Sequence, residues 1–263
     1  MNRYFATRVN WIGVATAAAL CCNVAAAEEK KEGWSGAAGL GYLSASGNAD
    51  NTNINASGEL YYDWEQWHHS AKALAIGAQA DGDSSAERYT LELKTQRDFT
   101  DTDYIYGLIA AQNDRFAGVR QQVSETIGYG RRLINTDVHV LNVEAGIGFR
   151  QLEFADTIDP DDVTITPNIL PGSTVGGEKE SSAIVRLGGN YRWNFSETAH
   201  FDQSLAIEAG SDNTSTESIS AVTAKLLGAM DLVFSFTVKN NSDVPIGTTS
   251  TDRFTAISLN YSW

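Results

Sequence analysis

The sequence contains little cysteine and little proline. Its two cysteines, Cys21 and Cys22, lie within the first 27 residues, and its four prolines fall in the segments 155–178 and 242–250. A chain with no cysteine after residue 27 is not a small domain held together by disulfides. Four prolines in 263 residues also exclude a collagen-like chain or a proline-rich linker.

Positive charge is scarce as well. Lys and Arg number 19 against 33 Asp and Glu, which gives a formal net charge of −14. A chain this acidic has no electrostatic footprint for nucleic acid, so we expect no nucleic-acid partner. Hydrophobic residues make up 42% of the chain, too many for a disordered protein. After the N-terminal segment there is no apolar run of about 18 residues, so no transmembrane helix is expected.

The first 27 residues have the pattern of a cleaved secretory signal peptide. Arg3 and Arg8 form a basic start, residues 11–20 are apolar, and 25–27 are three alanines. The alternative is a buried N-terminal helix, but no polar face interrupts the apolar run. Neither cysteine follows the small residue that a lipid anchor requires. We therefore expect a signal peptide at 1–27 and an exported mature domain at 28–263.

The mature domain alternates apolar and polar residues with a period of two, which predicts β-strands. In the last segment Ile257, Leu259 and Tyr261 alternate with Ser258 and Asn260. Twelve such strands are expected, at 34–46, 52–64, 67–80, 87–98, 103–115, 120–133, 138–154, 179–194, 200–211, 217–229, 231–241 and 251–263. The connections after odd strands are longer than those after even strands.

Two architectures fit twelve alternating strands, a soluble sandwich and a membrane barrel. Four features favour the barrel, namely an even strand number, long loops at one end, mid-strand charges and the tryptophan positions. The charged residues expected to line the lumen are Glu92, Lys94, Glu144, Arg150, Arg186, Arg192, Glu208 and Lys239. The tryptophans expected to form an interfacial girdle at the short-turn end are Trp34, Trp64, Trp67, Trp193 and Trp263.

The C-terminus indicates where the barrel is inserted. Residues 257–263 alternate up to a terminal aromatic, which resembles the C-terminal strand that the barrel-assembly machinery reads, and Tyr261 and Trp263 would form this assembly signal. We expect an all-β, 12-stranded antiparallel transmembrane β-barrel, an up-and-down meander closed by the first and last strands. It would lie in the outer membrane of a Gram-negative bacterium with both termini in the periplasm. Expected partners are periplasmic chaperones in transit, the barrel-assembly machinery, outer-membrane lipid and lipopolysaccharide.

Several motifs resemble one bacterial family. Residues 33–36, 39–42, 46–48 and 51–53 resemble the opening of the salt-induced outer membrane proteins, a barrel family of unknown function. The segments 128–131, 146–150 and 190–193 also resemble its strands. The family has no established catalytic residues, so the resemblance implies no site. Its name implies an envelope role under salt or osmotic stress.

Catalytic and metal-binding groupings are not apparent. The four mature histidines, His68, His69, His139 and His200, begin strands at the expected periplasmic end, and neighbours 68 and 69 point to opposite faces. Acidic residues in the loops 81–83 and 156–162 could hold Ca²⁺ or Mg²⁺, but their spacing favours solvated loops. We expect no catalytic residue, no metal and no cofactor.

Three functions are compatible with these features. The first is an envelope protein linked to salt stress, without enzymatic activity. The second is a porin-like narrow channel or transporter for small solutes, in which the basic strip of Arg150, Arg186 and Arg192 favours anions. If the protein is the envelope protein and not a channel, the opposite charges inside the barrel pair with one another and fill the lumen. The third is a membrane-embedded lipid-modifying enzyme.

Overall fold

The computed structural model describes residues 32–45, 51–80, 83–115, 119–154, 179–211, 213–244 and 249–263. In these ranges the chain forms twelve β-strands, and no helix there is long and apolar enough to cross a membrane. The strands are β1 (Gly33–Ala45), β2 (Asn51–Trp64), β3 (Trp67–Ala80), β4 (Asp83–Asp98), β5 (Asp103–Asp114), β6 (Val119–Asn135), β7 (His139–Phe154), β8 (Lys179–Ser196), β9 (Ala199–Ala209), β10 (Thr214–Leu227), β11 (Met230–Asn241) and β12 (Thr251–Ser262). The expected signal peptide at 1–27 lies outside the described residues.

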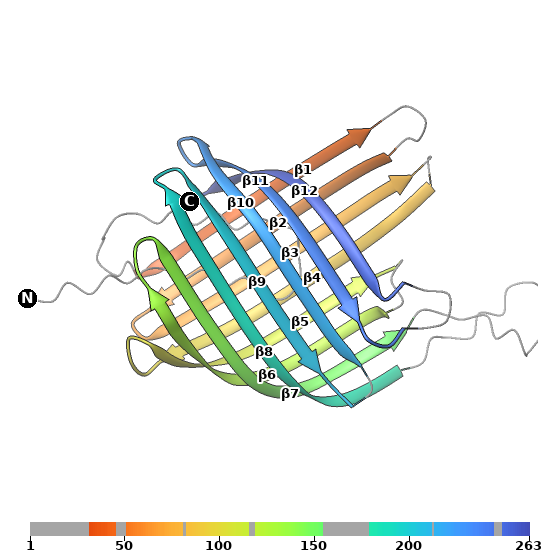
Figure 1. Cartoon of the computed structure of the whole chain (residues 1–263), viewed down its shortest axis with the longest axis horizontal. Coiled ribbons are helices and arrows are strands. Elements are labelled where there is room, and N and C mark those ends of the chain that lie inside the picture. The colour runs from red at the N-terminus through yellow and green to blue at the C-terminus, as the bar shows by residue number, and fades with distance from the viewer. Residues whose placement is uncertain are drawn as a thin grey trace, which may run out of the picture.

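The strands close into one barrel (Figure 1). Each strand runs antiparallel to its neighbours in sequence, and β1 completes the ring by pairing with β12. Antiparallel neighbours need only short connections, so a meander of this kind follows directly from strands separated by turns. The expected fold class, a 12-stranded antiparallel barrel closed by its first and last strands, is confirmed.

The predicted strand limits are wrong at two places. The sequence predicts a loop at 81–86, whereas β4 already begins at Asp83, which pairs with Ala80 of β3. Likewise β10 begins at Thr214 rather than at residue 217. Both segments are polar, and a polar segment between two alternating ones predicts a loop. Backbone pairing at the end of a hairpin does not require apolar side chains, so the hydrogen-bonded ladder extends through them.

Exposure alternates along the strands in a way that places the apolar side chains outside. On β11, Leu232 and Phe234 are 42% and 49% exposed, whereas Ser235 is 2% exposed. Some buried side chains contact each other from strands that are not neighbours. Ser258 Oγ of β12, for example, donates a hydrogen bond to Asn55 Oδ1 of β2 (3.0 Å). Such contacts are made inside the ring. The exposed Leu, Ile and Phe side chains therefore form the outer wall, which acyl chains solvate better than water does.

Tyrosine rings of β5 lie across glycines of β6 inside the barrel. A Cβ built on Gly130 would be 2.1 Å from the ring of Tyr104, and one built on Gly128 would be 2.7 Å from the ring of Tyr106. Both tyrosines are buried, at 0% and 3% exposure. The glycines of the segment 128–131 thus make room for two rings, which explains why glycine recurs in a strand where it would otherwise weaken pairing.

Replacing Gly130 with valine is expected to destabilise the barrel by about 1–3 kcal/mol, the usual range for overpacking. The new Cβ would displace the Tyr104 ring, whose hydroxyl donates a hydrogen bond to Glu144 (3.1 Å). Urea unfolding in detergent measures the change. Gly58→Val is the matched control because a Cβ at Gly58 meets nothing within 4 Å. Equal unfolding midpoints for the two variants would contradict the packing role of Gly130.

The joint between β1 and β12 is the shortest pairing among the described strands. Register pairs with β12 span only Ala37 to Leu40 of β1, whereas β1 pairs with β2 along all 13 of its residues. Two backbone hydrogen bonds between Gly36 and Trp263 extend the joint by one residue (3.1 and 3.0 Å). The Trp263 indole covers Gly36, where a Cβ would lie 2.5 Å from the ring. The last residue of the chain therefore takes part in closing the barrel.

Candidate functional site

The eight charged residues that the sequence assigns to the lumen are all buried, with exposures between 1% and 7%. They come from β4 (Glu92 and Lys94), β7 (Glu144 and Arg150), β8 (Arg186 and Arg192), β9 (Glu208) and β11 (Lys239). Charged groups at this level of burial need hydrogen bonds and counter-charges. The structure places most of them in pairs, and these pairs define the candidate site, which we call the lumen cluster.

The shortest ion pair of the lumen cluster joins two strands that are not neighbours. Lys94 Nζ of β4 lies 2.5 Å from Glu144 Oε1 of β7. The Tyr104 hydroxyl donates a second hydrogen bond to the same oxygen (3.1 Å), and the ammonium lies 4.6 Å from the ring centroid of Tyr106. A carboxylate with two donors, beside a cation held over an aromatic face, is well compensated for its burial.

A second group of contacts surrounds Glu208 of β9. Its carboxylate accepts hydrogen bonds from Gln122 (3.2 Å) and Ser124 (3.3 Å) of β6, and Arg186 lies 3.7 Å away. Arg150 donates instead to the backbone carbonyls of Glu208 (3.1 Å) and Asn213 (2.5 Å). The basic strip predicted on β7 and β8 is thus occupied by internal partners rather than facing an open path.

Arg192 of β8 is the third member of that strip, and it pairs with Asp202 of β9 at 2.7 Å. His200 Nε2 lies 3.2 Å from the other oxygen of the same carboxylate. Some inward polar atoms among the described residues have no hydrogen-bond partner, including both carboxylate oxygens of Glu92 and Nζ of Lys72. The cluster therefore contains charges of both signs, and it is only partly hydrogen-bonded within the protein.

One contact spans the barrel from wall to wall. Lys239 Nζ of β11 donates a hydrogen bond to Gln112 Oε1 of β5 at 2.6 Å. In the ring order, five strands separate β5 from β11 in either direction, so these strands lie opposite each other. Arg88 of β4 lies nearby in the same half of the barrel and pairs with Asp114 of β5 at 2.6 Å and with Asp252 of β12 at 3.7 Å. Side chains therefore reach across the interior from one wall to the other at this level.

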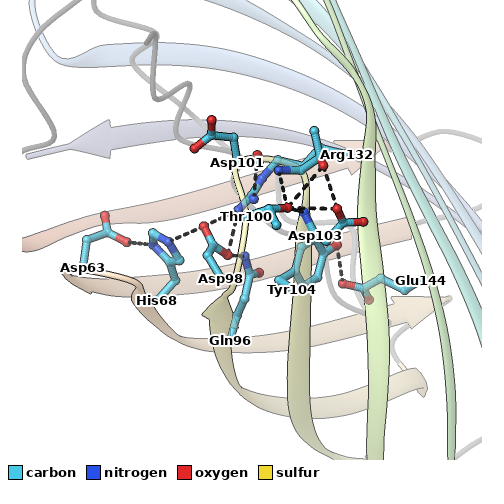
Figure 2. A network of polar contacts seen from close by, with 11 residues as sticks. Asp63, His68, Gln96, Asp98, Thr100, Asp101, Asp103, Tyr104, Arg132 and Glu144 are labelled. Carbon is cyan, nitrogen blue, oxygen red and sulfur yellow. Dashed lines mark hydrogen bonds and ion pairs between the residues drawn. The ribbon is translucent and has the colours of Figure 1, made fainter.

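A polar network ties strand ends together at the short-turn end of the barrel. Figure 2 shows His68 of β3 between two carboxylates, with its ring nitrogens 2.8 Å from Asp63 and 3.2 Å from Asp98. Gln96 (2.6 Å) and Arg132 (2.9 Å) also donate to Asp98. The network joins β2, β3, β4 and β6, so it holds these four strands together at that end of the barrel.

Four further charged residues belong to this interior and are not among the predicted lumen residues, namely Arg88, Asp98, Asp114 and Asp202. All four lie on the inward-facing positions of their strands and pair with residues described above. The two-residue alternation that identifies Lys94 and Glu92 on β4 extends to Arg88 and Asp98. That alternation is the signal that could have found them.

The five girdle tryptophans lie at the short-turn end of their strands. Trp34 is the second residue of β1, Trp64 and Trp67 flank the β2–β3 turn, and Trp263 follows β12. Trp193 of β8 pairs with His139, the first residue of β7. Outward histidines stack on two of these rings, His69 on Trp67 (centroids 6.1 Å apart) and His139 on Trp193 (6.3 Å).

The four histidines have different partners. His68 and His200 contact carboxylates inside the barrel, as described above. Nδ1 of His69 lies 3.1 Å from Thr95 Oγ1, and Nδ1 of His139 lies 2.9 Å from the Tyr191 hydroxyl. Among the described residues no group of three or more His, Cys, Asp or Glu side chains could hold a metal ion. The acidic residues at 81–82 and 156–162 lie outside the described ranges, and the expectation that no residue is catalytic stays a prediction.

Comparisons with known proteins place the chain among uncharacterised relatives. The sequence model of the family described as "Protein of unknown function, DUF481" matches residues 38–263. The uncharacterized protein YdiY of Escherichia coli strain K12 is 26% identical over 233 residues, which cover 88% of this chain and 84% of YdiY.

Among solved structures, the translocator domain of the autotransporter NalP from Neisseria meningitidis is similar, with a TM-score of 0.51 and 10% identity over 90% of each chain. The NanC porin matches with a TM-score of 0.44 and 8% identity, over 87% of this chain and 97% of the porin. At such low identity the likeness to the translocator domain concerns the fold, and it agrees with the closed antiparallel barrel.

Proposed function

The chain belongs to the DUF481 family, whose function is unknown, and we propose that it is an outer-membrane barrel whose own side chains close its lumen. In this proposal it is a non-enzymatic protein of the Gram-negative envelope, exported by the signal peptide predicted at 1–27, with both termini in the periplasm. The outer wall of exposed Leu, Ile and Phe and the tryptophans at one end support insertion in a bilayer. The barrel-assembly machinery and periplasmic chaperones would be its partners during insertion.

The contact between Lys239 and Gln112 carries the proposal. It joins opposite walls at 2.6 Å, so side chains cross the interior at that level. Inward residues beside Lys239, such as Thr237 at 1% exposure and Glu217, the register partner of Lys239, at 3%, have almost no surface that a water molecule could reach. A diffusion channel needs a continuous wet path, and paired side chains occupy the place of that path.

We expect the purified wild-type barrel to give no discrete conductance steps when it is inserted in planar lipid bilayers in concentrated KCl. The double variant Arg88→Ala/Lys239→Ala removes two long side chains that reach across the interior, and we expect it to conduct. Arg253→Ala is the matched control, because Arg253 is exposed on β12 and should leave the bilayer silent.

Other outcomes would favour the alternatives. Discrete steps from the wild type would support the narrow channel or transporter for small solutes. Product formed from labelled phospholipid or lipopolysaccharide would support a lipid-modifying enzyme. The association with salt or osmotic stress rests on the resemblance of the opening residues, and normal growth of a deletion strain in high-salt medium would remove it.

A further inference from the structure

Two adjoining grooves run along the outer wall of the barrel. Their volumes are about 1300 and 800 Å³, and they share Thr95, Gly107, Ile127, Ile147 and Val185. Most of the side chains that line them belong to the outward-facing set of β1 to β9. The smaller groove lies toward the short-turn end of the barrel, where Trp67 and Arg97 border it.

A gap in the outward side chains produces the smaller groove. Gly107 of β5 faces outward, and a Cβ built there would meet nothing within 4 Å. The residues on both sides are larger, with Ile105 46%, Ile127 67% and Tyr129 45% exposed. In a bilayer this narrow apolar depression is surrounded by acyl chains, and a chain that enters it gains contact on several sides.

The polar end of the groove carries an arginine without an acidic partner. Arg97 of β4 pairs in register with Trp67 of β3, and its guanidinium lies 5.5 Å from the centroid of the tryptophan ring. Among the described residues, Arg97 forms no ion pair. It is the next-to-last residue of β4, so it lies level with the tryptophan girdle, where lipid headgroups meet water.

We propose that this groove is a binding site for one glycerophospholipid, with an acyl chain along Gly107 and the phosphate on Arg97. A guanidinium binds a phosphate through paired, charge-assisted hydrogen bonds, and its position over an indole face holds it in place. The site rests on the proposed function, because it assigns the short-turn end to the periplasmic leaflet, which consists of phospholipid. Lipid A also carries phosphate, but it belongs to the opposite leaflet.

Native mass spectrometry of the barrel purified from outer membranes in mild detergent tests the site. The wild type is expected to retain an adduct with the mass of one glycerophospholipid. Arg97→Gln should weaken lipid binding at least roughly tenfold and lower the adduct fraction accordingly, since losing even one of the paired charge-assisted hydrogen bonds has that effect. Gly107→Leu should lower it similarly, because the new side chain fills the groove without touching the charge. Arg253 is exposed near the start of β12, at the end of the barrel opposite the short turns. Arg253→Gln should therefore leave the adduct unchanged.

Each other outcome has a defined meaning. A folded, heat-modifiable wild-type barrel without an adduct, or the same adduct in every variant, would overturn the site and leave the proposed function standing. An adduct with the mass of lipid A would overturn the phospholipid assignment and the leaflet with it. Absence of the protein from outer-membrane fractions would instead overturn the proposed function.

Discussion

Replacing Tyr261 and Trp263 together with alanine is expected to lower the amount of folded barrel in outer-membrane fractions, because a loss of about 1.4 kcal/mol in recognition of the C-terminal strand already weakens that recognition roughly tenfold. The β1–β12 joint is the shortest of the ring, and it ends in two hydrogen bonds between Trp263 and Gly36. The rings of Tyr261 and Trp263 stack 6.3 Å apart on the outer wall beside this joint. Heat-modifiable migration on gels measures the folded fraction.

A matched control separates the joint from general loss of lipid-facing surface. Phe234→Ala/Phe236→Ala removes two exposed rings from β11 and leaves the joint intact, so it should fold nearly as well as the wild type. Refolding of the Tyr261/Trp263 variant into detergent then distinguishes two causes. A defect in cells alone would indicate lost recognition by the assembly machinery, and a defect in both would indicate a weakened joint. Normal migration from cells would contradict both roles.

Alternation alone is sufficient to predict the barrel where the two faces of a strand differ in polarity. On β12, Leu259 is 41% exposed and Asn260 is 1% exposed, as the sequence pattern indicates. On β5 both faces are apolar. Tyr106 and Leu108 point inward at 3% exposure, while Ile105 and Ile109 point outward at 46% and 48%. In such a strand the inward face is set by register with its neighbours, which a single sequence does not reveal.

The pairs inside the lumen are less predictable than the faces. The alternation of β4 and β7 indicates that Lys94 and Glu144 both face the interior, but it does not indicate that they meet. Their contact depends on how far side chains reach across the two intervening strands of a closed and curved wall. The contact between Lys239 and Gln112 depends in the same way on the width of the barrel. These distances follow from strand tilt and stagger, which are properties of the whole ring.

The ion pair between Lys94 and Glu144 offers the largest energetic test of the interior. Replacing Glu144 with leucine is expected to destabilise the barrel by about 3–5 kcal/mol, because it leaves the Lys94 ammonium buried at 5% exposure without its nearest counter-charge. Lys94→Met should have a similar cost, since it leaves the carboxylate behind. Urea unfolding of the refolded protein in detergent measures both free energies.

The double variant Lys94→Met/Glu144→Leu decides whether the single variants lose stability through the lost ion pair or through changed packing. Removing both charges at once leaves no uncompensated ion, so its stability should return to within about 1–2 kcal/mol of the wild type. The coupling energy of the cycle is then large and favourable to the pair. Arg115→Met/Glu87→Leu is a matched control, because that pair lies 2.8 Å apart with Arg115 65% exposed and should show little coupling. Additive losses of stability at positions 94 and 144 would mean that the two charges do not interact. The proposal that paired side chains close the lumen would then lose its shortest ion pair.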